Sequence, residues 1–189
     1  MKYPYSYISF LILLFSAVTV FSQEEFVCVW RNPERNMTRI FPDARDYRTV
    51  DLRISGEKRE IIEERLGSEL LRGQRTQYPY YEMIGEEGQV IGYTIAAAQR
   101  GQFGVIEFVF GLDTNFIIRD IYIQRTRERN TEFRRREFLE LFIGKGINDV
   151  DLIEDLYDGE SSHGTDAVIL GLRKELITFD ELVLNRTET

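Results

Sequence analysis

The sequence predicts an α+β fold, in which an antiparallel sheet of four to five strands is packed by helices. Between Tyr78 and Gln124, four apolar segments with strand-type alternation are separated only by short turns. Loops this short force consecutive strands to lie antiparallel. Helical patterns stand on both sides of this region, and one face of such a sheet must be covered. The 189 residues fit a single domain that follows a leader.

Residues 1–22 have the pattern of a signal peptide. A cationic start at Lys2 precedes a mostly apolar run from Tyr7 to Phe21, and Ser22 offers a small-residue cleavage site before Gln23. The run is short for a membrane span, which needs about 20 residues. We therefore expect export with cleavage and a periplasmic or other extracytoplasmic location. A retained N-terminal membrane anchor is the alternative. Residues 23–40 are expected to form a linker, and residues 41–184 the folded domain.

Composition excludes several classes of function. The formal net charge is −8, from 24 Lys and Arg against 32 Asp and Glu. Non-specific nucleic-acid binding is therefore not expected, because phosphate contacts need a clustered positive face. One cysteine, Cys28, and one histidine, His163, cannot form a disulfide framework or a thiolate and imidazole metal site. No nucleophile elbow surrounds His163. We expect no metal site and no acid–base catalytic residue.

The first half of the domain is expected to hold a short strand over 49–54, a helix and the start of the sheet. Ser55 can cap a helix over Gly56–Leu66, which Gly67 ends. The strands are expected at Tyr78–Ile84, Gln89–Ala98, Val105–Leu112 and Phe116–Gln124. In the second of these strands, alternation places one set of side chains on a single face: Ile91, Tyr93, Ile95 and Ala97. In the third, it does the same for Ile106, Phe108, Phe110 and Leu112. Gly101 and Gly104 are expected to hold the tight reversal between these two strands.

Two helices are expected after the sheet. The first should run over 131–142, with an apolar stripe of Phe138, Leu141 and Phe142 and a left-handed cap at Gly144. The second should run over 165–176, with Val168, Leu172 and Leu176 aligned.

The loop from Asp158 to Thr165 comes directly before that last helix. A helix N-terminus presents unpaired N–H groups and the positive end of the dipole, so it favours a phosphate. A hydroxyl there can cap the helix without any ligand, or it can carry the ligand as a phosphoester. The local chemistry leaves both interpretations open.

Glycine-marked segments along the chain resemble a known family. They are Gly88-Gln89-Val90-Ile91-Gly92-Tyr93, Arg100-Gly101-Gln102-Phe103-Gly104, Phe110-Gly111-Leu112-Asp113 and Phe142-Ile143-Gly144-Lys145. Together they resemble the FMN-binding domain family of the flavin-carrying subunits of Rnf complexes and sodium-translocating NADH:quinone reductases. The resemblance covers roughly residues 42–176. It implies an electron-transfer flavoprotein that carries FMN and serves a redox partner protein or a membrane electron-transfer complex.

The resemblance also implies where FMN is held. In the family, a Ser/Thr-Gly-Ala-Thr/Ser motif opens the last helix, and its final hydroxyl is esterified to the FMN phosphate. An ungapped match over 167–174 puts that hydroxyl on Ser162, whereas one inserted residue puts it on Ser161 and matches Asp155 and Gly159. The motif is degenerate, since Glu160 replaces the Gly in one register and the Ala in the other. The candidate cofactor residues are Ser162, Ser161, Thr165, Gly164 and His163.

Residues 125–136 are rich in arginine. Six arginines stand among the twelve residues 125–136. They form either a solvated helix start or a docking patch for an acidic partner or for lipid headgroups, which would be a membrane-surface contact from Arg125 to Arg136. The alternative function is an exported binding or assembly module that kept the fold and lost the flavin.

Overall fold

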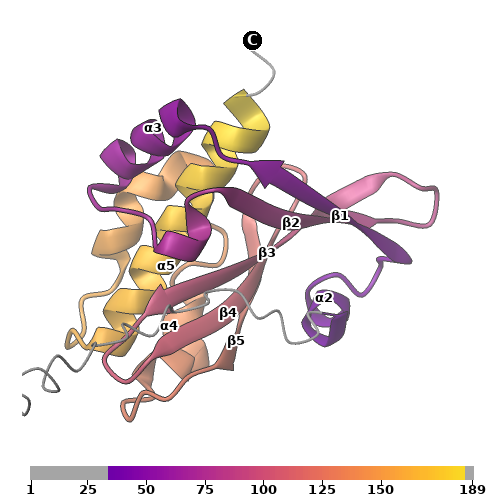
Figure 1. Cartoon of the computed structure of the whole chain (residues 1–189). Coiled ribbons are helices and arrows are strands. Elements are labelled where there is room, and N and C mark those ends of the chain that lie inside the picture. Colours follow the sequence, from indigo (N-terminus) through magenta and orange to yellow (C-terminus); the bar gives the residue numbers. More distant parts are fainter. Residues whose placement is uncertain (1–33, 186–189) are drawn as a thin grey trace, which may run out of the picture.

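The computed structural model describes residues 34–185 (Figure 1). The prefix η marks short 3₁₀ segments, and η4 is a π-helix. The elements in chain order are α2 (Glu34–Ile40), β1 (Asp46–Arg53), α3 (Gly56–Leu66), η1 (Arg72–Gln74), β2 (Gln77–Ile84), β3 (Val90–Arg100), β4 (Val105–Leu112), β5 (Ile118–Arg125), η2 (Glu132–Arg134), α4 (Arg136–Glu140), η3 (Ile147–Leu156), α5 (His163–Phe179) and η4 (Asp180–Leu184).

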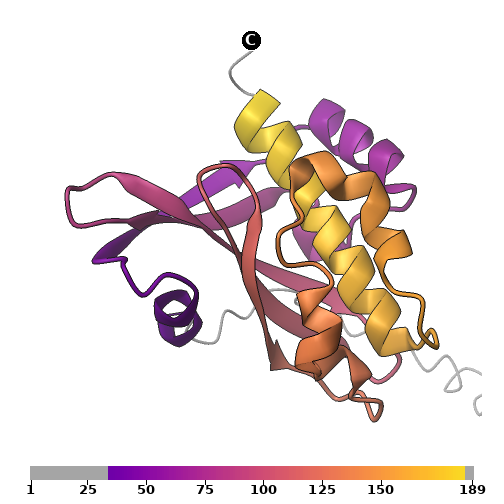
Figure 2. The ribbon, with the colours of Figure 1, turned by 180° about the vertical axis from the view of Figure 1, so that it is seen from behind.

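The sheet is a five-stranded antiparallel meander in the order β1-β2-β3-β4-β5, which confirms the predicted α+β class. The helices α3, α4 and α5 cover one face of it (Figure 1, Figure 2). The predicted inward face of β4 is fully buried at Ile106, Phe108, Phe110 and Leu112. The aligned residues Val168, Leu172 and Leu176 of α5 are also fully buried. The main core therefore lies between the sheet and α5, as the alternation and the helical spacing predicted.

The face predicted for the second strand is wrong at its beginning. Met83 pairs with Gly92, but Ile84 pairs with Val90, so Ile91 is an extra residue in a β-bulge. Ile91 consequently packs with a second cluster on the far face of the sheet, whereas Tyr93 packs against the main core. Gly92 has φ 157°, and a Cβ there would lie 2.5 Å from the carbonyl oxygen of Leu112. Alternation cannot reveal a bulge that depends on such a close approach.

The second cluster is built around α2, in a stretch that was expected to be linker. Met37 and Ile40 of α2 are buried with Phe41, Met83 and Val109. This small helix covers part of the sheet face opposite α5 (Figure 2). The folded domain therefore includes residues 34–40 as well. The expected signal segment, residues 23–33 and Cys28 lie outside the described residues.

The predicted helix over 131–142 is broken into two short pieces. Arg135 is extended, with φ −68° and ψ 144°, and it separates η2 from α4. Because the helical register is interrupted, the buried residues differ from the predicted stripe. Leu139 is 5% exposed, whereas Leu141 is 36% exposed. Gly144 has φ 82°, in the left-handed region where the sequence placed a cap.

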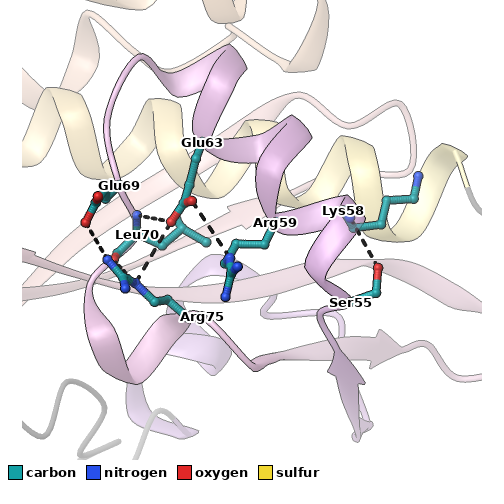
Figure 3. Close-up of polar contacts among 7 residues, drawn as sticks. All are labelled: Ser55, Lys58, Arg59, Glu63, Glu69, Leu70 and Arg75. Atoms are coloured by element: carbon teal, nitrogen blue, oxygen red, sulfur yellow. Dashed lines mark hydrogen bonds and ion pairs between the residues drawn. The ribbon is translucent and has the colours of Figure 1, made fainter.

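Helix α3 has the boundaries that the sequence predicted, and polar contacts tie it to the loop that follows (Figure 3). The Ser55 hydroxyl accepts a hydrogen bond from the Lys58 N–H, and Gly67 ends the helix at φ 73°. Glu63 accepts a hydrogen bond from the Leu70 N–H at 2.9 Å and lies 3.8 Å from Arg59. These contacts fix the loop that leads from α3 towards β2.

A buried lysine joins α5 to the sheet where β2 and β3 separate. The β2–β3 pairs run from Tyr81–Thr94 to Ile84–Val90. Within residues 34–185, the second half of β3 therefore has β4 as its one neighbouring strand. The Lys174 ammonium donates to the Ala98 carbonyl at 2.8 Å and lies 3.2 Å from the Glu175 carboxylate. Backbone acceptors on a buried strand edge need such donors. Lys174 thus fixes α5 on the sheet.

Candidate functional site

The candidate site is the N-terminus of α5, and Ser162 is its N-cap. Ser162 has extended backbone angles, φ −141° and ψ 157°, and its Oγ accepts a hydrogen bond from the Thr165 N–H at 3.2 Å. The Thr165 Oγ1 in turn accepts from the Ser162 N–H at 2.8 Å. This reciprocal pair is a capping box. The helix begins two residues before the predicted Thr165, because the cap includes His163 and Gly164 in its first turn.

Two backbone donors of that first turn remain available. The N–H groups of His163 and Gly164 have no hydrogen-bond acceptor among residues 34–185. The first N–H groups of a helix point along its axis, and the helix dipole adds positive potential there. A phosphate oxygen placed at this end would therefore meet two N–H donors. The Ser162 hydroxyl, which is half-buried, lies next to them.

Ser161 and Ser162 differ in what their hydroxyls do. The Ser161 side chain is exposed and donates to both oxygens of Asp166, each at 2.9 Å. An ester on Ser161 would remove that donor and bring a phosphate dianion toward the Asp166 carboxylate, which Coulomb repulsion opposes. In the cap, the Ser162 Oγ accepts from the Thr165 N–H and lies 3.1 Å from the Thr165 Oγ1, a contact in which either hydroxyl can donate, and it makes no contact with the Asp166 carboxylate. The geometry therefore suits a phosphoester on Ser162 better than one on Ser161.

Gly164 and Thr165 fix the start of the helix by packing. A Cβ on Gly164 would lie 2.5 Å from Cε1 of the Phe133 ring and closer still to Cδ1, and Phe133 in η2 is itself fully buried. Thr165 is also fully buried. No side chain larger than hydrogen fits at 164, so η2 presses directly against the first turn of α5. The cap is thus a rigid platform. Sequence reasoning missed Phe133, which the pattern placed on a continuous helix.

The loop before the cap is acidic. Asp158 and Glu160 are exposed, and Glu160 directly precedes the two serines. The Tyr157 hydroxyl donates to the Glu160 carbonyl at 3.3 Å, and Gly159 lies against the Tyr157 ring. The two carboxylates would repel a bound phosphate, although exposed charges are strongly screened by water and salt. They weaken the site without blocking the two N–H donors.

The His163 side chain is exposed, whereas three tyrosines of β2 and β3 lie in or against the main core. The His163 imidazole is exposed, with no hydrogen-bond partner among the described residues. Tyr78 and Tyr80 are buried in the core, and burial raises the pKa of Tyr78 well above its usual value. Tyr93 stacks on Phe116 at 5.8 Å between ring centroids. These aromatic side chains therefore pack in or against the main core.

The arginine-rich segment divides into paired and unpaired residues. Arg125 pairs with Glu107, Arg135 pairs with Glu132, and Arg136 pairs with Asp120 and Glu140. The remaining three, Arg127, Arg129 and Arg134, make no ion pair within residues 34–185. The segment is not the start of a continuous helix, because it runs through the end of β5, a loop, η2 and the extended Arg135 to the first residue of α4. Its unpaired charge is concentrated in the loop after β5.

Further properties of the described part bear on function. Among residues 34–185, no group of three or more His, Cys, Asp or Glu side chains is arranged to hold a metal ion. No helix in that range is long and apolar enough to span a membrane. A cavity of about 90 Å³ lies beside Lys174, Glu175 and Tyr78, away from the α5 cap. No protein-family model matches the chain, and no curated protein matches it.

Proposed function

We propose that the chain is an exported, FMN-carrying electron-transfer domain that holds the FMN phosphate at the N-terminus of α5. The observation that carries the proposal is the position of Ser162. The family resemblance points to this hydroxyl, and it stands at the N-cap of a 17-residue helix beside two available N–H donors. A helix N-terminus favours a phosphate through both its free donors and its dipole.

Each residue of the cap has a role in this proposal. Ser162 carries the phosphate as an ester or contacts it through its hydroxyl. The N–H groups of His163 and Gly164 donate to phosphate oxygens, while the Thr165 side chain keeps the cap in place through the Ser162 N–H. Gly164 allows η2 to pack closely, which keeps this platform rigid. FMN supplies the redox chemistry when bound, and the protein positions it. No residue acts as an acid–base catalyst.

The proposed setting follows from the leader and the family resemblance. The chain is exported, and its partner is a redox protein or a membrane electron-transfer complex. No nucleic acid is involved, in keeping with the net charge of −8.

A second candidate function is a flavin-free exported binding or assembly module on the same fold. Glu160 favours it, because a carboxylate stands where the family motif has glycine or alanine. The complete capping box also favours it, since Ser162 and Thr165 satisfy each other without a ligand. In this case the hydroxyls stabilise α5 by roughly 1 kcal/mol and do nothing more.

Visible absorption separates the two candidates. Purified protein, expressed with its export route intact, should show the absorption bands of a flavin in the first case and none in the second. Ser161→Ala should leave the bands unchanged, whereas Ser162→Ala should reduce them, and circular dichroism should confirm that both variants are folded. Protein that remains colourless even after incubation with excess FMN would contradict the flavin proposal and support the module.

A further inference from the structure

Two loops at one end of the molecule are joined into a single rigid unit, which we call the hairpin tip: residues 100–104 and 126–129. The β3–β4 reversal closes with a hydrogen bond from the Gly101 N–H to the Gly104 carbonyl, at 2.8 Å. Glu128 in the second loop is 9% exposed, and its Oε1 accepts from the Phe103 N–H at 2.7 Å. A Cβ on Gly101 would lie 2.5 Å from the same oxygen. The buried carboxylate thus locks the two loops together.

The hairpin tip presents one exposed aromatic ring surrounded by unpaired arginines. Phe103 is 44% exposed, and the Arg129 guanidinium carbon lies 5.1 Å above its ring centroid, a cation–π contact. Arg100 and Arg127 are exposed as well. None of the three arginines makes an ion pair within residues 34–185. The two neighbouring carboxylates are buried and engaged, Glu128 with the Phe103 N–H and Glu107 with Arg125. Three arginines against the one carboxylate of the tip, Glu128, give it a positive formal charge on a chain whose net charge is −8.

We propose that the hairpin tip docks on an anionic lipid surface. Arg100, Arg127 and Arg129 would contact headgroup phosphates, which guanidinium groups recognise through paired N–H donors. Phe103 would lie at the boundary between headgroups and acyl chains. Basic side chains near an anionic membrane each strengthen attachment through the surface potential. Because Glu128 holds the backbones of the two loops together, the tip needs little backbone ordering to make these contacts.

The composition of the tip favours lipid over an acidic protein. A stable protein interface buries about 800 Å² on each partner around an apolar, well-packed centre. The tip offers a single exposed apolar side chain, Phe103, among charged ones. A lipid surface needs only point charges and a shallow aromatic contact. The β3–β4 turn and the loop after β5 also lie at the same end of the molecule as the start of α5 (Figure 1, Figure 2). Docking through the hairpin tip does not require bound flavin.

Vesicle binding tests the proposal directly. The full chain is mixed with vesicles of equal parts phosphatidylglycerol and phosphatidylcholine, and separately with phosphatidylcholine alone, at about 20 mM and about 300 mM salt. The N-terminal segment contributes equally to every variant, so the readout is the preference for anionic over neutral vesicles. We expect a clear preference at low salt that largely disappears at high salt. The exposed carboxylates Asp158 and Glu160 oppose the attraction at low salt, and added salt screens their repulsion together with the attraction of the arginines.

Charge-matched variants assign the preference to the tip. Arg100→Gln with Arg127→Gln and Arg129→Gln should lower anionic-vesicle partitioning by up to about 100-fold, at about fivefold for each arginine. The control triple, Arg35→Gln with Arg53→Gln and Arg119→Gln, removes the same charge from exposed positions elsewhere and should change partitioning by about fivefold or less. Circular dichroism checks the fold of both triples.

A fluorescence probe reports depth, and two outcomes would overturn the proposal. Phe103→Trp in a Trp30→Phe background, which removes the chain's one other tryptophan, should show a blue shift with anionic vesicles. Equal loss of binding in the two triples, or no preference for anionic vesicles, would refute lipid docking. A chain that binds poly-glutamate but not vesicles, and that loses this binding only in the tip triple, would also refute lipid docking. The tip would then be assigned to an acidic protein partner.

Discussion

Replacing Gly164 by valine tests the packing on which the start of α5 depends. The new side chain would begin with a Cβ 2.5 Å from Cε1 of Phe133, closer than the 3.0 Å that real Cβ atoms keep. Phe133 is fully buried and cannot swing into solvent, so η2 or the first turn of α5 must move. Overpacking of this kind destabilises by about 1–3 kcal/mol. We expect the free energy of unfolding to fall by this amount.

Gly56→Val is the matched control, because Gly56 also lies in the first turn of a helix and a Cβ added there would have no heavy atom within 4 Å. Urea unfolding of both variants gives the packing contribution as a difference, so the helix propensity of valine largely cancels. The melting temperature of Gly164→Val should lie below that of the control by about 2–4 °C per kcal/mol. In the double variant Gly164→Val with Phe133→Leu, the loss should be smaller than the sum of the single effects. Equal stability of Gly164→Val and Gly56→Val would refute the close contact.

Two further predictions concern stability. Leu139→Ala should lower the free energy of unfolding in urea by about 2–5 kcal/mol, whereas Leu141→Ala should lower it by less than about 1 kcal/mol. The reverse order would contradict the broken helix and support a continuous helix over 131–142. Burial alone would raise the pKa of Glu181, but hydrogen bonds from Arg65 and Asn185 outweigh it and lower the pKa below 4.5. A depressed carboxylate pKa stabilises the fold above the unfolded pKa and loses that stability as pH falls. Glu181→Gln should therefore lose less stability than the parent chain between about pH 5 and pH 3, and identical pH profiles would contradict this assignment.

The sequence predicted those parts of the fold that depend on local periodicity. Alternation identified the inward face of β4, and spacing identified the buried stripe of α5, because both elements are regular and face a single core. The bulge at Ile91 escaped prediction, since it depends on how closely Phe41 and Leu112 approach Gly92. The extended backbone at Arg135 interrupts a segment of good helix formers, so helix propensity gave no sign of it.

The candidate site was predictable in its position and unpredictable in its detail. Ser162 and Thr165 form the kind of cap that a hydroxyl-rich loop before an apolar stripe indicates. The difference between Ser161 and Ser162 depends on Asp166, whose carboxylate accepts the Ser161 hydroxyl. Phe133 packs against Gly164 although the two residues lie far apart in the sequence, so no local sequence pattern indicates this contact. The same is true of Glu128, which locks the hairpin tip from within an arginine-rich loop.

Intact-mass measurement of the denatured chain tests the central claim, that Ser162 at the α5 cap carries the FMN phosphate. The wild-type protein and Ser161→Ala should each show the added mass of one FMN, and Ser162→Ala should show none. An addition that survives in Ser162→Ala and disappears in Ser161→Ala would contradict the choice of serine. No added mass in the wild-type protein, together with no flavin in the supernatant after denaturation, would contradict the cofactor itself and leave a flavin-free module.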